Sequence, residues 1–429
     1  MGTPIQVSEQ LEQPIAGEPQ PCRLVVLVVD GFGIGEAPDA ADFDSLGANT
    51  LGNTAAAVGG LILPFLERAG LGRLTAATGL QPVPEPEAFV GRLVEHSAAN
   101  DSPNGHWELF GVVTETAPPT YPDGFPDEVV SEFEKAIGRP VLCNRRMNGL
   151  DVLRMYGQVH LLSGQPILYT SGDSVFQLAV HTDVAPVAQL YEWCASARTI
   201  LRGQHAVCRV IARPFTGSLG TFSRLPARRD WALPPPRPTG LRVLRAQGHE
   251  VIGIGKIENL FGAQELTRSF HPGDNAGVYQ VLTDIMKRPP SNREVIVANL
   301  VDTDTKYGHG RDPQGMASAL SELDSFLATT IPQLGSRSVF VVTGDHGNDP
   351  TWAHSTDHTR ERVPLVAWVP GRRGRDVGTR AMADLGATAL AILGCPNPND
   401  GTPIAEITDA AESANLCTLG HSALPVVDT

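Results

Sequence analysis

Long hydrophobic runs are missing from this sequence of 429 residues, and so is an amino-terminal stretch in which basic residues precede an apolar segment. A membrane-spanning helix needs about 18 or more consecutive apolar residues, and a secretory signal needs that order of basic and apolar residues. We therefore expect a cytoplasmic protein with no membrane partner. The polar, proline-containing residues 1–20 are expected to form a flexible amino-terminal segment.

Basic residues are too few for a protein that binds nucleic acid. The chain has 33 Lys and Arg against 47 Asp and Glu, a formal net charge of -14, whereas nucleic-acid binding relies on clustered positive charge. Cysteine is also scarce, and the six cysteines include no Cys-X-X-Cys pair, which excludes a zinc ribbon and a dithiol redox site. A small anionic substrate is compatible with this composition. The sequence does not determine the oligomeric state, and a monomer is compatible with it.

Three apolar stretches of the chain end on acidic residues. They are CRLVVLVVDGFGIG from residue 22, EVIVANLVDTD at 294–304 and SVFVVTGDHGND at 338–349. Continuous apolar runs of this length predict parallel strands that are buried on both faces of a sheet. Ligands of open α/β sheets bind beyond the carboxyl ends of the strands. Three such ends would therefore bring carboxylates from distant parts of the chain together.

Helical periodicity appears between these strands. It predicts helices over 126–138, 312–331 and 378–394. Strands that alternate with helices predict an α/β fold in which helices flank a central, mostly parallel sheet.

A second domain is expected within this α/β fold. The length suggests about two to three domains. Residues 115–235 differ in composition from the rest of the chain, because they are rich in Arg and end at a proline cluster. We place an inserted domain at 115–235, the core at 21–114 and 236–415, and a carboxy-terminal tail at 416–429.

The acidic strand ends and the histidines that follow them predict a metal site. Asp and His ligands on separate strand ends suit two divalent cations, which in phosphoryl transfer stabilise the attacking and the leaving oxygen. Carboxylate-rich sites favour manganese or magnesium, and the histidines also permit zinc. A single strand-end Asp more often caps a helix, so the combination carries the prediction. The predicted ligands are Asp30, Asp304, His309, Asp345, His346 and His358.

The stretch NDSPNGHWE at 100–108 raises a question about Ser102. A serine before a helix is most often an N-cap, whose oxygen accepts a hydrogen bond from a backbone N–H of the first turn. A serine beside a metal site can instead act as a nucleophile, because a cation lowers the pKa of its hydroxyl. The metal pattern favours the nucleophile, although both roles are compatible.

These blocks, taken in order, resemble the phosphopentomutases of the alkaline phosphatase superfamily. The resemblance rests on VVLVVDGFGIGEAPDA, GHWEL, LYTSGDSVFQ, RVIARPF, IGKIENLF, NLVDTDTKYGHGRD and DHGNDPT, and it covers roughly residues 22–395. It implies an alkaline-phosphatase-like metal-binding core with a smaller inserted α/β cap domain. The implied activity is transfer of phosphate between C1 and C5 of ribose or deoxyribose, through a phosphoserine enzyme and a bisphosphate intermediate. Manganese is the expected cation.

The resemblance also implies roles for individual residues. Asp30, Asp345 and His346 would bind one cation together with Ser102, the nucleophile. Asp304, His309 and His358 would bind the other. A phosphosugar substrate would be held by Ser171, Asp173, Arg209, Arg224, Arg228 and Lys256. The nucleophile loop would be supported by Asp101, Asn104, His106 and Glu108.

The nucleophile loop departs from the family pattern, which reads Gly-Lys-Asp-Thr-X-Thr-Gly-His-Trp-Glu. Here Asn100 replaces the lysine, Ser102 the nucleophilic threonine and Asn104 the second threonine. Arg145 or Arg146 could supply the missing cation from the cap, or both could be surface charges. The departures leave open a phosphate-monoester hydrolase, or a mutase acting on a modified sugar phosphate. A non-catalytic phosphosugar-binding protein is the alternative from another class.

Overall fold

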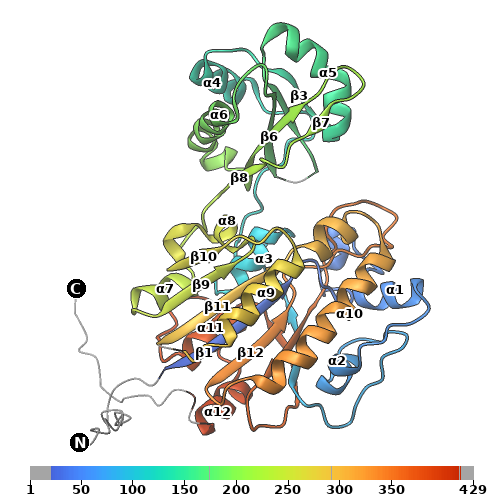
Figure 1. The fold of residues 1–429 in the computed structure, drawn as a ribbon, viewed down its shortest axis with the longest axis vertical. Coiled ribbons are helices and arrows are strands. Elements are labelled where there is room, and N and C mark those ends of the chain that lie inside the picture. The colour runs from blue at the N-terminus through green and yellow to red at the C-terminus, as the bar shows by residue number, and fades with distance from the viewer. Residues whose placement is uncertain (1–20, 173, 291, 415, 417–429) are drawn as a thin grey trace, which may run out of the picture.

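The computed structural model describes residues 21–414 and 416, apart from 173 and 291, and it contains two sheets (Figure 1). The larger sheet has eight strands in the order β10-β9-β11-β1-β12-β13-β2-β14. Its strands are β1 (Cys22–Val29), β2 (Phe89–Val94), β9 (Glu250–Ile254), β10 (Arg268–Phe270), β11 (Arg293–Leu300), β12 (Ser338–Thr343), β13 (Val363–Trp368) and β14 (Asp376–Ala381).

The smaller sheet has six strands and is formed by the middle of the chain. Five of them run in the order β3-β4-β5-β6-β7, and β8 pairs with β6. They are β3 (Leu142–Arg146), β4 (Ile167–Thr170), β5 (Val175–His181), β6 (Arg209–Thr216), β7 (Ser223–Arg224) and β8 (Arg229–Ala232). This sheet packs with α4 (Asp127–Ile137), α5 (Gly149–Ser163) and α6 (Val187–Ile200), which lie with it in the upper body of Figure 1. We call this body the cap and the larger one the core.

The remaining helices flank the larger sheet. They are α1 (Thr50–Ala57), α2 (Pro64–Ala69), α3 (Ser102–Leu109), α7 (Gly240–Ala246), α8 (Ile257–Phe261), α9 (Asn275–Met286), α10 (Pro313–Thr330), α11 (Ala383–Ile392) and α12 (Ala405–Ser413). Short helical turns span Ala40–Phe43, Leu71–Arg73, Gly203–His205, Ala263–Glu265, Thr303–Gly308 and Ile331–Gln333. No helix among the described residues is both long enough and apolar enough to cross a membrane.

The predicted parallel strands lie side by side in the centre of the larger sheet. β1 pairs in parallel with β11 on one side and with β12 on the other, and β9 continues the parallel order beyond β11. The carboxyl ends of these four strands therefore meet at one edge, because neighbouring parallel strands point the same way. The α/β fold expected from the sequence is confirmed, whereas the exact domain boundaries stay a prediction.

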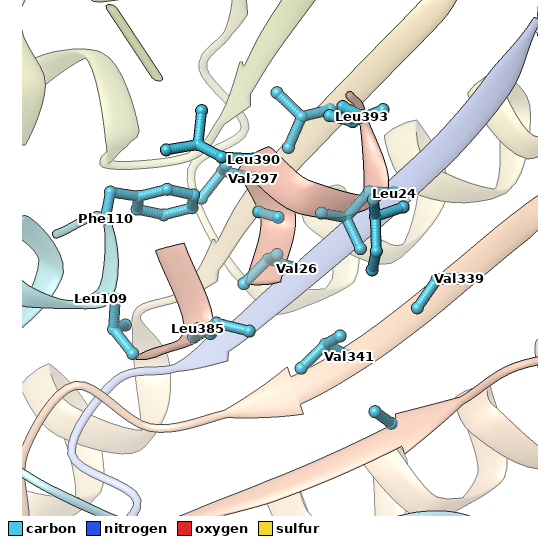
Figure 2. Packing of buried hydrophobic residues seen from close by; sticks show 14 of the residues in the cluster. Leu24, Val26, Leu109, Phe110, Val297, Val339, Val341, Leu385, Leu390 and Leu393 are labelled. Atoms are coloured by element: carbon cyan, nitrogen blue, oxygen red, sulfur yellow. The ribbon is translucent and has the colours of Figure 1, made fainter. Parts of the chain in front are cut away.

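Strand β1 is buried on both faces, as its unbroken apolar run predicts. Leu24 and Val26 belong to the cluster on the face of the sheet that α3 and α11 cover, together with Phe110 and Leu390, and Figure 2 shows Leu24 beside Leu393. Successive side chains of a strand point to opposite faces. The alternate residues of β1 accordingly join a second cluster, which includes α10, on the other face of the sheet.

The helix predicted over 378–394 is only partly present, and the predicted position of its first residue is wrong. Residues Asp376–Ala381 form β14, which pairs in parallel with β2 at the edge of the sheet, and α11 begins only at Ala383. The register shifts beside Gly378, whose φ is +79°. Pairing with a distant strand decided this segment, because helical periodicity describes only local sequence. The other two predicted helices correspond to α4 and α10.

The buried side chain of Arg360 holds the loop that leads from β2 to α3. The residue is 1% exposed, and its guanidinium donates hydrogen bonds to Glu95 Oε2 (2.5 Å) and to the carbonyl oxygens of Ser97 (2.9 Å) and Ala99 (3.2 Å). It also forms an ion pair with Asp39 at 2.9 Å. These contacts connect the segments of Asp39 and Arg360 to the loop just ahead of α3.

We predict that Arg360→Met destabilises the protein by about 3 to 5 kcal/mol, because removing one partner of a buried ion pair leaves the other charge unpaired. The free energy of unfolding in urea measures this. Replacing both partners, Arg360→Met with Glu95→Leu, should recover part of the loss. Arg373→Met is the control, because its ion pair with Glu85 is exposed and should contribute less than about 1 kcal/mol. An equal loss in the two single variants would contradict the prediction.

Candidate functional site

Four neighbouring parallel strands deliver charged side chains to one edge of the larger sheet. Asp30 follows β1, Asp304 lies in the turn after β11, Asp345 follows β12, and Lys256 follows β9. The three acidic residues are fully or almost fully buried. The acidic strand ends converge as the sequence predicts. The end of β9 adds the positive charge of Lys256 to them.

Asp30, Asp304 and His346 form the first metal group. One ligand atom from each lies within 4.8 Å of the others, and all three residues are buried. The distance between Asp30 Oδ1 and His346 Nε2 is 3.6 Å. The carboxylate of Asp345 adjoins this group, because its Oδ2 lies 3.3 Å from the same His346 nitrogen. The group can therefore offer carboxylate oxygens and an imidazole nitrogen to one cation.

Asp304, His309 and His358 form the second metal group, so Asp304 belongs to both. Its two carboxylate oxygens lie 3.5 Å from His309 Nε2 and from His358 Nε2. The Nδ1 atoms of the two histidines lie beside the carbonyl oxygens of Thr356 (2.5 Å) and Asn100 (3.0 Å). Contacts of this kind orient a metal-binding imidazole, since they leave the opposite nitrogen facing the site.

The charges of this edge fit bound cations. Burial alone would raise the pKa of Asp345, but His346 and His106 hold that pKa below its usual value. Burial likewise would lower the pKa of His346, and the carboxylates of Asp345, Asp30 and Asp304 raise it instead. The imidazole nitrogens of His106 and His346 lie 3.1 and 3.3 Å from the buried Oδ2 of Asp345, but neither forms a hydrogen bond of good geometry with it. Buried charges in proteins are paired or coordinate metals, so this donor set suits divalent cations.

Ser102 lies against the first metal group. Its residue is 3% exposed, and its Oγ lies 3.4 Å from Asp30 Oδ1, 3.3 Å from His346 Nε2 and 3.1 Å from Lys256 Nζ. The helix cap is a different residue, because Asp101 is the N-cap of α3 and accepts a hydrogen bond from the Asn104 N–H at 3.0 Å. The sequence allowed Ser102 to be both the helix cap and the nucleophile. In the structure Asp101 is the cap, so the Ser102 hydroxyl is not used for capping.

The residues predicted to support the nucleophile loop hold α3 in place. His106 Nδ1 lies 2.9 Å from the Ser102 carbonyl oxygen and 3.1 Å from Asp345 Oδ2. The Asn104 side chain donates to Asp101 Oδ1 at 2.7 Å. Glu108 Oε2 accepts from the N–H and the hydroxyl of Ser97, at 2.7 and 2.6 Å. Ser102 therefore lies at the start of a helix that hydrogen bonds and ion pairs hold on several sides.

Asn299 and Trp107 also position this site, and of the two only Asn299 was missed by sequence reasoning. The Nδ2 of Asn299, in β11, lies 3.0 Å from Asp30 Oδ2 and 3.2 Å from His106 Nε2. The Trp107 indole donates to the Leu260 carbonyl at 2.8 Å, which joins α3 to the helix that follows Lys256. A polar residue inside the apolar run of β11 was a signal that could have identified Asn299.

A cavity of about 1260 Å³ lies between this edge and the cap. Most of the predicted substrate ligands line it, and the arginines among them come from β6, β7 and the segment before β8. Asp173 lies outside the described residues. The predicted residues that line the cavity are Ser102, Ser171, Arg209, Arg224, Arg228, Lys256, Asp304, His309 and His358.

The arginines of the cap differ in how they are paired. Arg228 makes a two-pronged contact with the Asp230 carboxylate, in which both distances are 2.7 Å. Arg213 is not among the predicted substrate ligands, but it lines the cavity and donates to Gln177 Oε1 at 3.1 Å. Burial lowers the pKa of Arg213 to about 10, and the nearby Arg228 and Arg224 contribute to this fall. The cap side of the cavity is therefore rich in positive charge.

Comparison with known proteins identifies similar chains. The model of the Metalloenzyme superfamily matches residues 244–397. The chain is 47% identical to the phosphopentomutase of Dictyoglomus turgidum, over 85% of this chain and 93% of that one. It is 46% identical to the phosphopentomutase of Deinococcus radiodurans, over 89% and 98%. Among solved structures, the phosphoglycerate mutase of Leishmania mexicana has a TM-score of 0.46 at 13% identity, over 92% of this chain and 99% of that one.

Because Asp304 belongs to both metal groups, we predict that Asp304→Asn lowers the binding of both cations. His309→Ala should weaken only the second group and leave the first occupied. Metal content after equilibration with manganese and desalting, measured by inductively coupled plasma mass spectrometry, distinguishes the two variants. Asp302→Asn is the control, since that carboxylate contacts Lys306 and the Asn275 N–H instead. Wild-type metal content in Asp304→Asn would contradict the assignment.

Proposed function

The chain belongs to the phosphopentomutase family, and we propose that it moves a phosphoryl group between C1 and C5 of ribose or deoxyribose. It is a metal-dependent phosphomutase, and therefore an isomerase. The observation that carries the proposed chemistry is the position of Ser102. Its hydroxyl lies among Asp30, His346 and Lys256 and borders the cavity whose opposite wall carries the arginines of the cap.

The cation sites are part of this proposal. Asp30, Asp345 and His346 would hold one cation beside Ser102, and Asp304 with the two histidines of the second metal group would hold the other. Asp304 also lies close enough to Asp30 and His346 to contribute an oxygen to the first cation. When bound, the cations would lower the pKa of the serine hydroxyl and offset negative charge on the transferring phosphoryl group. Manganese is the favoured metal because carboxylate oxygens supply much of the donor set.

Ser102 carries the phosphoryl group between the two positions of the sugar. The substrate hydroxyl attacks the phosphorus of phospho-Ser102, the bond from phosphorus to Oγ breaks, and the proton of the substrate hydroxyl is released. A sugar bisphosphate results. After it turns over in the cavity, Oγ attacks the other phosphorus and the bond from that phosphorus to the sugar oxygen breaks. The sugar oxygen takes up a proton, and the isomeric monophosphate leaves. A cavity of about 1260 Å³ exceeds the usual ~300–1,000 Å³ of small-molecule sites, which leaves room for this reorientation.

Positive groups on opposite sides of the cavity support the binding of a bisphosphate. Lys256 and the positive dipole end of α3 would face the phosphoryl group that is being transferred. Arg209, Arg213 and Arg224 would face the other phosphate, because arginine matches the geometry of phosphate oxygens. Ser171, at the end of β4, lines the cavity between them and would contact a sugar hydroxyl. A soluble phosphosugar of this kind agrees with the predicted cytoplasmic location.

The phosphoserine can be tested by intact-mass spectrometry. Purified wild-type protein, incubated with a sugar bisphosphate, should gain the mass of one phosphoryl group, and Ser102→Ala should not gain it. Ser102→Thr keeps a hydroxyl at the same position and is expected to be phosphorylated and to retain part of the activity. Equal phosphorylation of the Ser102→Ala variant would contradict the proposed nucleophile.

Lys256 is expected to stabilise the transferring phosphoryl group. Lys256→Met should lower kcat/KM for ribose 1-phosphate about 10- to 100-fold, since a hydrogen bond to a charged partner contributes roughly 1.5–3 kcal/mol. Lys287→Met serves as the control, because that lysine is exposed at the C-cap of α9 and pairs with Asp284. A loss of the same size in both variants, or in neither, would contradict this role.

A further inference from the structure

The cap and the core approach each other at the rim of the cavity, beside Gly172. A Cβ atom at Gly172 would lie 2.9 Å from Asp357 Oδ2 and 3.0 Å from Arg146 Nη2. Because both atoms lie close to the same point, Asp357 Oδ2 and Arg146 Nη2 are at most 5.9 Å apart, the sum of the two distances. They do not form a direct ion pair. Arg146 belongs to β3 of the cap, and Asp357 directly precedes His358 of the core. We call these two residues the rim pair.

Both charges of the rim pair are available to each other. Among the described residues, neither side chain forms an ion pair or a hydrogen bond, although the guanidinium of Arg311 lies close enough to Asp357 to interact with it electrostatically. The backbone of Asp357 is nevertheless anchored, since its N–H donates to Ser355 Oγ at 3.1 Å and its carbonyl oxygen accepts from Arg311 at 3.4 Å. The carboxylate thus has a defined position from which it faces the cap.

An irregularity in β3 directs Arg146 toward this position. The register between β3 and β4 shifts between Cys143 and Arg145, which leaves one extra residue in β3. Cys143 and Asn144 have positive φ values of 77° and 47°, and the Asn144 side chain is bonded to the backbone N–H and carbonyl of Phe125. Bulges of this kind re-aim side chains and occur next to active sites. The strained backbone is therefore held in place by a specific contact.

We propose that Arg146 and Asp357 are positioning residues that form an ion pair when the cap closes over bound substrate, and that this contact keeps water away from phospho-Ser102. Asp357 lines the cavity next to a ligand of the second metal group, so the pair would close the rim at the reacting end. The small gap at Gly172 admits the approach, because a larger side chain there would separate the two charges.

The consequence concerns the competition between transfer and hydrolysis, and it rests on the proposed phosphoserine mechanism. In hydrolysis a water oxygen bonds to the phosphorus of phospho-Ser102, the bond to Oγ breaks, and a water proton is transferred to Oγ. The product is free phosphate instead of isomer. A contact that favours the closed cap lowers the fraction of phosphate that is lost in this way.

The test measures isomer and free phosphate together, with ribose 1-phosphate and manganese as the probe. Arg146→Ala should raise the ratio of phosphate to isomer by up to about fivefold, the range expected for a solvent-accessible ion pair. Gly172→Val should have the same effect without changing any charge. Arg154→Ala is the matched control, because that arginine is exposed on α5 of the same cap and pairs only locally with Asp151. Its ratio should equal that of the wild type.

Two further measurements make the outcome decisive. The charge swap, Arg146→Asp with Asp357→Arg, should return the ratio toward the wild-type value. Raising the ionic strength should increase the ratio in the wild type but not in Arg146→Ala, since salt screens exposed pairs. A wild-type ratio in folded Arg146→Ala would overturn the rim pair while leaving the mutase intact. Free phosphate as the sole product of the wild-type enzyme would overturn the proposed function and this inference with it.

Discussion

The burial of several carboxylates at one edge of a parallel sheet is the constraint on which the rest of this site depends. Asp30, Asp304 and Asp345 each follow a different strand, and the pairing of β1 with both β11 and β12 brings them together. Neighbouring carboxylates repel one another strongly when they are buried away from water, so the arrangement requires compensating positive charge. Lys256 supplies part of it, and the donor geometry around Asp304 suits divalent cations for the rest. Metal dependence thus follows from how the sheet ends.

Ser102 is held in place by hydrogen bonds that its neighbours make, which explains how the loop tolerates substitutions. Asp101 caps α3, and Glu108 joins that helix to the preceding loop, so Ser102 has no structural hydrogen bond to maintain at the cap. Asn100 stands where the family pattern has lysine, and it contacts His358 through its backbone carbonyl, which any residue possesses. A serine hydroxyl and an asparagine at these positions therefore leave the surrounding geometry intact.

The cap complements the core in charge. The core edge is acidic and fits cations, whereas the facing wall of the cavity presents arginines, of which Arg213 is half-buried and has a lowered pKa. An anionic substrate that carries phosphate at two positions can satisfy both surfaces at once, through cations on one side and guanidinium groups on the other. The same complementarity favours closure of the cap, and the rim pair extends it to the boundary of the cavity.

The sequence by itself determined the features that depend on residues close together in the chain. Apolar runs that end on Asp identified the central strands and their carboxylates, and helical periodicity identified α4 and α10. It did not determine that Asp376–Ala381 would pair with β2, that Asp101 would cap α3 in place of Ser102, or that Asp230 would engage Arg228. Those outcomes, like the approach of Arg146 to Asp357, were decided only by the tertiary structure. The physical reason is that each one is a competition among partners that the folded chain brings together, and the periodicity of a single segment contains no information about those partners.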